Sequence, residues 1–180
     1  MTLLRPAPVT LRRVERISPD VDFHHIYREH AAAVHRFAVG LTGGNRALAD
    51  DLTADAFVRL WTGHGEIRMP TVRAYLCTIV RNAFVSHIRN TRRTTALDER
   101  LTDPVDRIEA PLERRSEAAA ALRALATLSA DDREALLMRA ADMSYSDIAE
   151  SLNITVAAAK VRVHRARVRV LRAREEQSWK

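Results

Sequence analysis

The stretch SYSDIAESLNITVAAAKVRVHRAR, residues 144–167, decides the fold. The apolar residues of its first half, Ile148, Ala149 and Leu152, have helical spacing. Asn153 follows at a point where a tight turn requires left-handed backbone, and Thr155 is placed to cap a second helix. Two short helices joined in this way predict a helix-turn-helix, a motif that places its second helix in the major groove of DNA.

The second helix of this motif is strongly basic. Between Val156 and Arg174 there are seven basic residues and no acid. A helical wheel places Arg162, Arg165, Arg169 and Arg172 roughly opposite the apolar residues Ala159, Val163, Ala166 and Val170. A charged face is usually only solvated, but we expect no acid to pair with these arginines, which favours DNA contact. The residues predicted to contact duplex DNA are Thr155, Val156, Ala157, Lys160, Arg162, Arg165 and Arg169.

The composition of the whole chain favours helices. Its 180 residues are 47% hydrophobic, with only five glycines and six prolines, and the net charge is +6. No apolar stretch approaches the roughly 20 residues of a membrane span, and Pro6 and Pro8 stand where a signal peptide would have an apolar run. We therefore expect a soluble cytoplasmic protein without a membrane partner. Cys77 is the only cysteine, so we expect no disulfide or paired-cysteine zinc site, and a buried thiol.

The pattern of breaks predicts an all-α fold of two small helical domains joined by a flexible linker. Residues 1–20 are a predicted flexible extension, and three helices follow within residues 21–93, interrupted at Gly43-Gly44 and between Thr62 and Pro70. Charged residues and prolines dominate the predicted linker, residues 94–116. The second domain, residues 117–176, begins with a predicted helical segment from Ala118 to Leu128, and further helix starts are predicted at Ser129, Ser144 and Thr155.

Two sequence resemblances cover most of the chain. In the second domain, DREALL (132–137), SY (144–145), IAE (148–150) and KVRVHRAR (160–167) resemble region four of the extracytoplasmic-function sigma factors. In the first domain, FHHIYR (23–28), VHRF (34–37), DDLTADAFVRLW (50–61) and RAYLCTIVRN (73–82) are similar to region two of that family. Ala158 and Val161 differ from the Thr and Ser that the family commonly has there.

The resemblance implies an alternative sigma factor that directs core RNA polymerase to promoter DNA and opens it. The second helix of the helix-turn-helix would read the minus-35 element. The exposed face of Asp50, Asp51, Asp55 and Arg59 would bind the polymerase clamp, although the residues alone suggest only a solvated face. The third helix would grip the minus-10 element with Thr78, Arg81, Asn82 and Arg89, and the loop from Gly63 to Met69 would capture a flipped base. The family also makes an anti-sigma factor a candidate partner.

Other functions are weaker candidates. The chain has no phosphate-binding glycine loop and no recognisable nucleophile–base arrangement, so we expect no enzyme and no cofactor. His24, His25, His30 and His35 are not spaced to bind one metal ion, and Trp61 and Tyr75 are expected to be core residues. A free-standing helix-turn-helix repressor or activator is the main alternative, with the first domain serving dimerisation or ligand sensing. An adaptor whose basic helix binds an acidic protein is the third.

Overall fold

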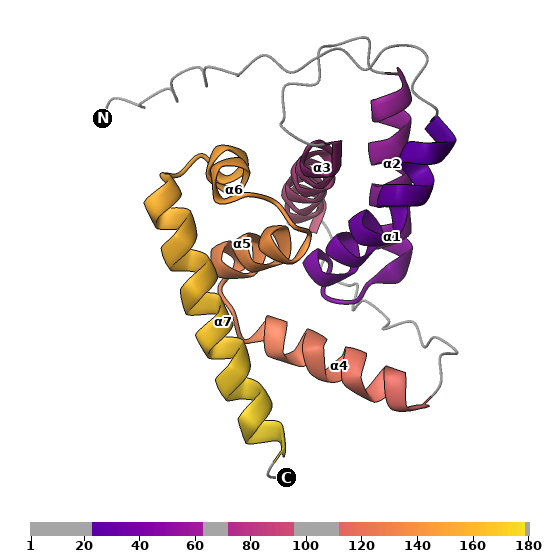
Figure 1. Cartoon of the computed structure of the whole chain (residues 1–180). Coiled ribbons are helices and arrows are strands. Elements are labelled where there is room, and N and C mark those ends of the chain that lie inside the picture. Colours follow the sequence, from indigo (N-terminus) through magenta and orange to yellow (C-terminus); the bar gives the residue numbers. More distant parts are fainter. Residues whose placement is uncertain (1–22, 63–71, 96–111, 179–180) are drawn as a thin grey trace.

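The structure is a computed structural model that describes residues 23–62, 72–95 and 112–178, with side chains for residues 23–62, 72–91 and 117–175. These residues form seven α-helices and no strand (Figure 1). The helices are α1 (Phe23–Leu41), α2 (Arg46–Thr62), α3 (Val72–Thr95), α4 (Leu112–Ala126), α5 (Ala130–Ala140), α6 (Tyr145–Leu152) and α7 (Val156–Ser178). The predicted all-α fold is confirmed.

Helices α1, α2 and α3 pack against one another as a bundle. Its core includes Val34 from α1, Ala56 from α2, and Leu76 and Val80 from α3, all without exposed surface. The predicted break between the first two helices is confirmed, because Gly43 and Gly44 both have positive φ, at 68° and 99°. Such angles favour glycine.

One aromatic prediction needs correction. Trp61 was expected in the core but is 68% exposed, and the nearby Tyr27 is 48% exposed. They form an aromatic cluster with Phe23 and Phe57, with ring centroids 5.1 Å apart for Phe23 and Trp61 and 4.9 Å apart for Tyr27 and Phe57. Helical spacing favoured a core position for Trp61, but this residue lies at the end of α2, where the bundle does not cover it. Tyr75 is half-buried against the core.

Cys77 has the character expected of it. Its side chain is fully buried, and burial raises the pKa of the thiol to about 12. A thiol with this pKa stays protonated near neutral pH and behaves as a small apolar group.

The caps predicted in the second domain are confirmed. Ser129 accepts a hydrogen bond from the backbone N–H of Asp132, and Ser144 forms a capping box with Asp147. Asn153 ends α6 in left-handed conformation, with φ 53°. Thr155 Oγ1 accepts from the N–H of Ala158 at 3.1 Å, at the start of α7. Helices α6 and α7 are therefore the two helices of the predicted helix-turn-helix.

Two helices extend into the stretch predicted as a linker. Helix α3 continues to Thr95, and α4 begins at Leu112, directly after Pro111. Pro111 favoured a linker in the prediction, yet a proline just before a helix is compatible with the first turn of that helix. The extension over residues 1–20, the loop from Gly63 to Met69 and the middle of the predicted linker lie outside the described residues.

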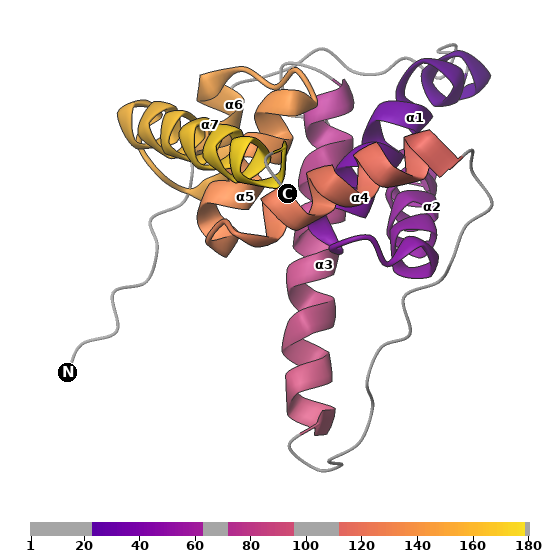
Figure 2. The same cartoon turned by 90° about the horizontal axis from the view of Figure 1, so that it is seen from below.

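The two halves of the chain pack together. Buried apolar residues form one cluster that includes Phe37 of α1, Leu76 of α3 and Met138 of α5. Helices α5 and α6 lie against the first bundle, with α7 on their far side (Figure 1), and the C-terminal half of α3 projects away from the other helices (Figure 2). None of the described helices is long and apolar enough to cross a membrane.

Candidate nucleic-acid interface

Helix α7 has one buried side and one exposed side. Ala159, Val163 and Ala166 are fully buried, as predicted, and anchor the helix. On the exposed side near its N-terminus lie Val156, Ala157, Lys160 and Val161. An anchored helix with an exposed N-terminal half after a tight turn has the geometry that inserts into a major groove.

Tyr145, at the start of α6, holds cations from both neighbouring helices. The Lys160 ammonium lies 5.9 Å from the centre of the tyrosine ring, and the Arg139 guanidinium lies 5.4 Å from it. Both distances are within the range of a cation–π interaction. This contact orients Lys160 on the surface of the helix-turn-helix.

Three of the arginines predicted to contact DNA are ion-paired with α5. Arg162 lies 3.0 Å from Asp131, Arg165 donates two hydrogen bonds to Asp132, at 2.8 and 2.5 Å, and Arg169 lies 3.6 Å from Asp132. The argument that no acid neutralises these arginines is therefore wrong. The partners come from the first turn of another helix, which a scan of the basic segment alone could not reveal.

These ion pairs are possible because the arginines lie closer to the buried side of α7 than predicted. Arg162 and Arg169 lie beside the buried stripe, because residues three apart are about 60° apart around an α-helix. The prediction that the arginines lie roughly opposite the apolar stripe is therefore wrong for Arg162 and Arg169. Arg167, on the other flank of α7, has no ion-pair partner among the described residues.

Asp132 is the buried member of this cluster, only 1% exposed. Hydrogen bonds from Arg165 hold the pKa of its carboxyl below the ordinary value of 3.8, against the opposing effect of burial. Because the folded pKa is lowered, the charged carboxylate stabilises the fold fully above pH 3.8, and the contribution is lost as the pH falls through the folded pKa. Acidification that protonates Asp132 should therefore destabilise the helix-turn-helix.

The first prediction follows from this ion pair. We expect the free energy of unfolding to fall as the pH decreases below the ordinary pKa of Asp132, and Asp132→Asn to remove that part of the pH dependence. Urea unfolding from neutral pH to about pH 3 measures it. Asp131→Asn is the matched control, since the Asp131 side chain is 66% exposed. Equal acid sensitivity in wild type and Asp132→Asn would contradict the prediction.

The residues predicted to grip the minus-10 element share one side of α3, but not all of them are free. Asn82 and Arg89 are exposed, and Asn82 Oδ1 accepts a 3.3 Å hydrogen bond from the neighbouring Arg81. Thr78 Oγ1 lies 3.1 Å from Ser151 Oγ of α6, and Arg81 donates to Glu134 of α5 at 2.9 Å and to the Ser151 carbonyl at 3.5 Å. The second half of the chain therefore covers part of this face.

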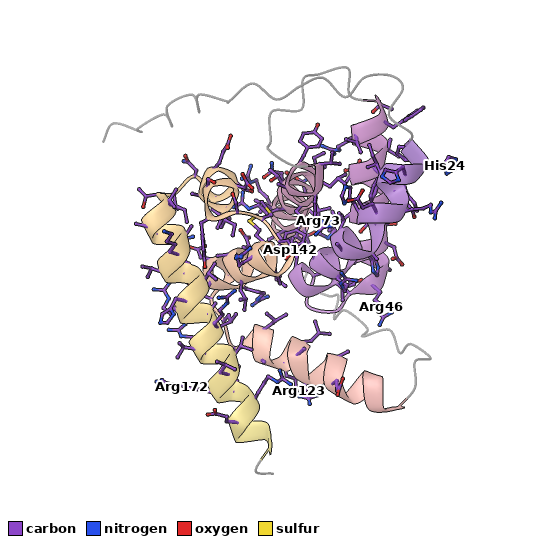
Figure 3. All side chains as sticks on the ribbon, viewed as in Figure 1. His24, Arg46, Arg73, Arg123, Asp142 and Arg172 are labelled. Atoms are coloured by element: carbon purple, nitrogen blue, oxygen red, sulfur yellow. The ribbon has the colours of Figure 1, made fainter. Side chains whose placement is uncertain are left out.

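A second ion pair joins the same two halves. Arg73 of α3 donates to Asp142 at 2.9 Å, in the turn between α5 and α6, and Figure 3 shows the two side chains next to each other. Asp142 is held at positive φ, 62°. The partners in the second half of the chain, namely Glu134, Asp142 and Ser151, were not identified from sequence, because nothing local links residues separated by 53 to 73 positions.

The predicted polymerase-binding residues of α2 lie together on an exposed surface. Asp50 accepts a 2.7 Å hydrogen bond from His35, and Arg59 pairs with Asp55 at 2.8 Å. Asp51 is exposed and has no ion-pair partner among the described residues. Val58, 57% exposed, and Trp61 lie on the same surface and were missed. Charged and apolar side chains side by side are typical of a protein-binding surface.

These features define a helical DNA-binding protein with a helix-turn-helix and a second bundle that presents separate polar surfaces. The family description "Sigma-70 region 2" matches residues 26–94, and "Sigma-70, region 4" matches residues 118–170. The chain is 35% identical over 158 residues to the ECF RNA polymerase sigma factor SigL of Mycobacterium tuberculosis, covering 82% of this chain and 85% of that protein. It belongs to the extracytoplasmic-function (ECF) family of RNA polymerase sigma factors.

A further relative and two solved structures are also similar to this chain. The ECF RNA polymerase sigma factor SigE of Mycolicibacterium smegmatis is 29% identical over 79% of this chain and 57% of that protein. The sigma factor RpoE of Bartonella quintana, solved with the anti-sigma factor NepR, has a TM-score of 0.74 and 28% identity, over 86% of this chain and 97% of that one. CnrH, solved with the cytosolic domain of CnrY, shares the fold at a TM-score of 0.61 and 23% identity, over 86% and 88% of the two chains.

Family membership settles the class of function. The chain is an alternative sigma factor, which works with core RNA polymerase and promoter DNA in transcription initiation. Sigma factors in general are not enzymes. The free-standing repressor or activator is not favoured.

Proposed function

We propose that this sigma factor divides promoter recognition among three surfaces. Helix α7 reads the minus-35 element, α3 grips the minus-10 strand, and the exposed side of α2 binds the polymerase clamp. The observation that carries this division is that α7, α3 and α2 each present exposed polar residues away from their buried stripes. We also propose that the protein acts in the cytoplasm, has no catalytic activity and needs no cofactor.

Transcription in vitro tests the proposal as a whole. The full chain is added to core RNA polymerase on genomic DNA fragments, and transcription start sites are mapped. We expect starts at promoters that share a minus-35 and a minus-10 element. Starts that do not depend on the chain, or tight binding of duplex promoter DNA by a symmetric dimer without polymerase, would contradict it.

The proposed contact with the minus-10 strand centres on Asn82. Its amide is exposed, and an asparagine can form two hydrogen bonds to one base. We expect Asn82→Ala to reduce discrimination among minus-10 sequences by roughly 1 to 3 kcal/mol. Competition binding of holoenzyme to pre-opened promoters with different minus-10 elements measures this. His87→Ala, at an exposed position of α3 about 140° around the helix from Asn82, is the control; equal discrimination by Asn82→Ala and wild type would refute the contact.

The arginines of α7 combine a proposed DNA contact with a role in the fold. Arg167→Ala should reduce the slope of log affinity against log salt concentration by about 0.9, the value for one phosphate contact, with no change in stability. Arg165→Ala should also lower the free energy of unfolding, because it leaves the buried Asp132 carboxylate without its main partner. Salt titrations and urea unfolding of both variants separate the two roles. Equal stability of the two variants would contradict this assignment.

The packing of α5 and α6 against α3 has a consequence for this function. Thr78 and Arg81 contact Ser151 and Glu134, so they cannot contact a DNA strand at the same time. We propose that the two halves separate when the minus-10 strand binds. The similarity to a sigma factor solved with an anti-sigma factor supports an anti-sigma factor as a further partner.

A further inference from the structure

The exposed side of the recognition helix carries apolar side chains at its centre. Val161 is 59% exposed, although valine is a large hydrophobic residue. Val156 is 43% exposed but lies about 140° away from Val161 around the helix. Ala157, one turn before Val161 and about 40° from it around the helix, is exposed as well. The outermost line of α7 therefore has no side chain that can form a hydrogen bond with a base at positions 157 and 161.

Cations border this apolar line on both sides. Helical geometry at 100° per residue places Lys160 and Arg167 on one flank of Val161, and Arg162 and Arg165 on the other. Lys160 is held against Tyr145, and Arg162 and Arg165 are held by the acids of α5. A narrow apolar line between two cationic flanks matches the major groove, in which base edges lie between two rows of phosphates.

The chemistry of the groove identifies what an apolar side chain can read there. Guanine, adenine and cytosine present hydrogen-bonding groups, whereas thymine adds a C5 methyl group. Valine cannot satisfy a donor or an acceptor, so it gains most from contact with that methyl group. We propose that Val161 is a specificity-determining residue that selects thymine at one position of the minus-35 element through its methyl group. The inference rests on the proposed minus-35 contact of α7.

The test removes only the methyl group from the DNA. Holoenzyme made from the full chain first selects its preferred minus-35 sequence from duplex promoters randomised there. Each thymine of that sequence, on either strand, is then replaced singly by deoxyuridine, which keeps every hydrogen-bonding group. We expect one replacement to weaken binding by wild-type holoenzyme about fourfold, the effect of one buried methyl group.

Two variants assign the effect to Val161. In Val161→Ser, thymine and deoxyuridine at that position should bind equally, and the exposed site makes the change compatible with folding. Leu171→Ala is the matched control, because Leu171 is also 59% exposed on α7 but lies about 15 Å further along the helix. It should keep the fourfold difference.

The outcomes separate the inference from the proposed function. A selected minus-35 element without thymine, no effect of deoxyuridine on wild type, or an undiminished effect in Val161→Ser would overturn the role of Val161 while leaving minus-35 recognition in place. Holoenzyme binding that does not depend on the minus-35 sequence would overturn the proposed function of α7 as well.

Discussion

Reversing Asp51 and Asp55 to lysine is expected to weaken binding to core RNA polymerase about 100-fold. Two charges would change sign at the proposed clamp contact, and disrupting a close charge pair at an interface typically costs 2 to 5 kcal/mol. The fold should not suffer, because Asp51 is exposed and the pair of Asp55 with Arg59 lies at the surface. Binding is measured by titrating labelled protein with core enzyme.

The control for this variant carries the same change of charge elsewhere. Glu117 on α4 and Glu175 on α7 are both exposed, and Glu117→Lys with Glu175→Lys alters the net charge equally. This control should bind core enzyme like wild type. Normal binding by the folded Asp51→Lys, Asp55→Lys protein would remove the clamp assignment of α2.

Glu134→Arg is expected to raise the affinity for the single minus-10 strand about 30-fold. The change replaces the pairing of Glu134 with Arg81 by repulsion between two cations, and both side chains are largely buried, at 25% exposure for Arg81 and 13% for Glu134. Hydrogen bonds to charged groups contribute about 1.5 to 3 kcal/mol. A closed form weakened by that amount raises the fraction of chains competent to bind, and the apparent affinity rises with it.

Added positive charge alone also favours DNA, so this prediction needs two further variants. Glu117→Arg adds the same charge at an exposed position of α4 and should raise affinity far less. Gly40→Leu adds no charge. A Cβ at Gly40 would already lie 2.5 Å from Leu137 Cδ2 of α5. A full leucine side chain adds three more carbon atoms toward α5, more than a shift of the Leu137 side chain alone can accommodate, while leucine favours the helix α1 itself. The variant should therefore loosen α5 and also raise strand affinity; no gain in either Glu134→Arg or Gly40→Leu would contradict a competing closed form.

Local sequence signals predicted the elements of the fold accurately. The caps at Ser129 and Ser144 and the left-handed turn at Asn153 depend only on side chains and backbone within a few residues. The first residues of the helix that begins at Leu112 were assigned to the linker, because Pro111 and the flanking charges resemble a linker. Trp61 was misplaced because periodicity tells which residues share a face and not how far the neighbouring helix extends.

The residues of the candidate site could be predicted from the sequence only in part. Residues exposed by their own helix, such as Asn82, Asp51 and Lys160, could be identified from spacing, charge and the resemblance to a family. Their partners could not. The charge pattern of one segment does not reveal an acid on another helix, so the pairing of Arg165 with Asp132 was invisible until the helices were placed in space.

The sequence by itself determined the helices, their caps, the helix-turn-helix and the sigma factor family, because each depends on short-range spacing and on motifs read in order. Only the tertiary structure decided which charges are neutralised, that α5 and α6 cover Thr78 and Arg81, and that Val161 stands exposed between two cationic flanks. The physical reason is that ion pairing and burial depend on distances between residues far apart in the chain, and those distances exist only after the helices have packed.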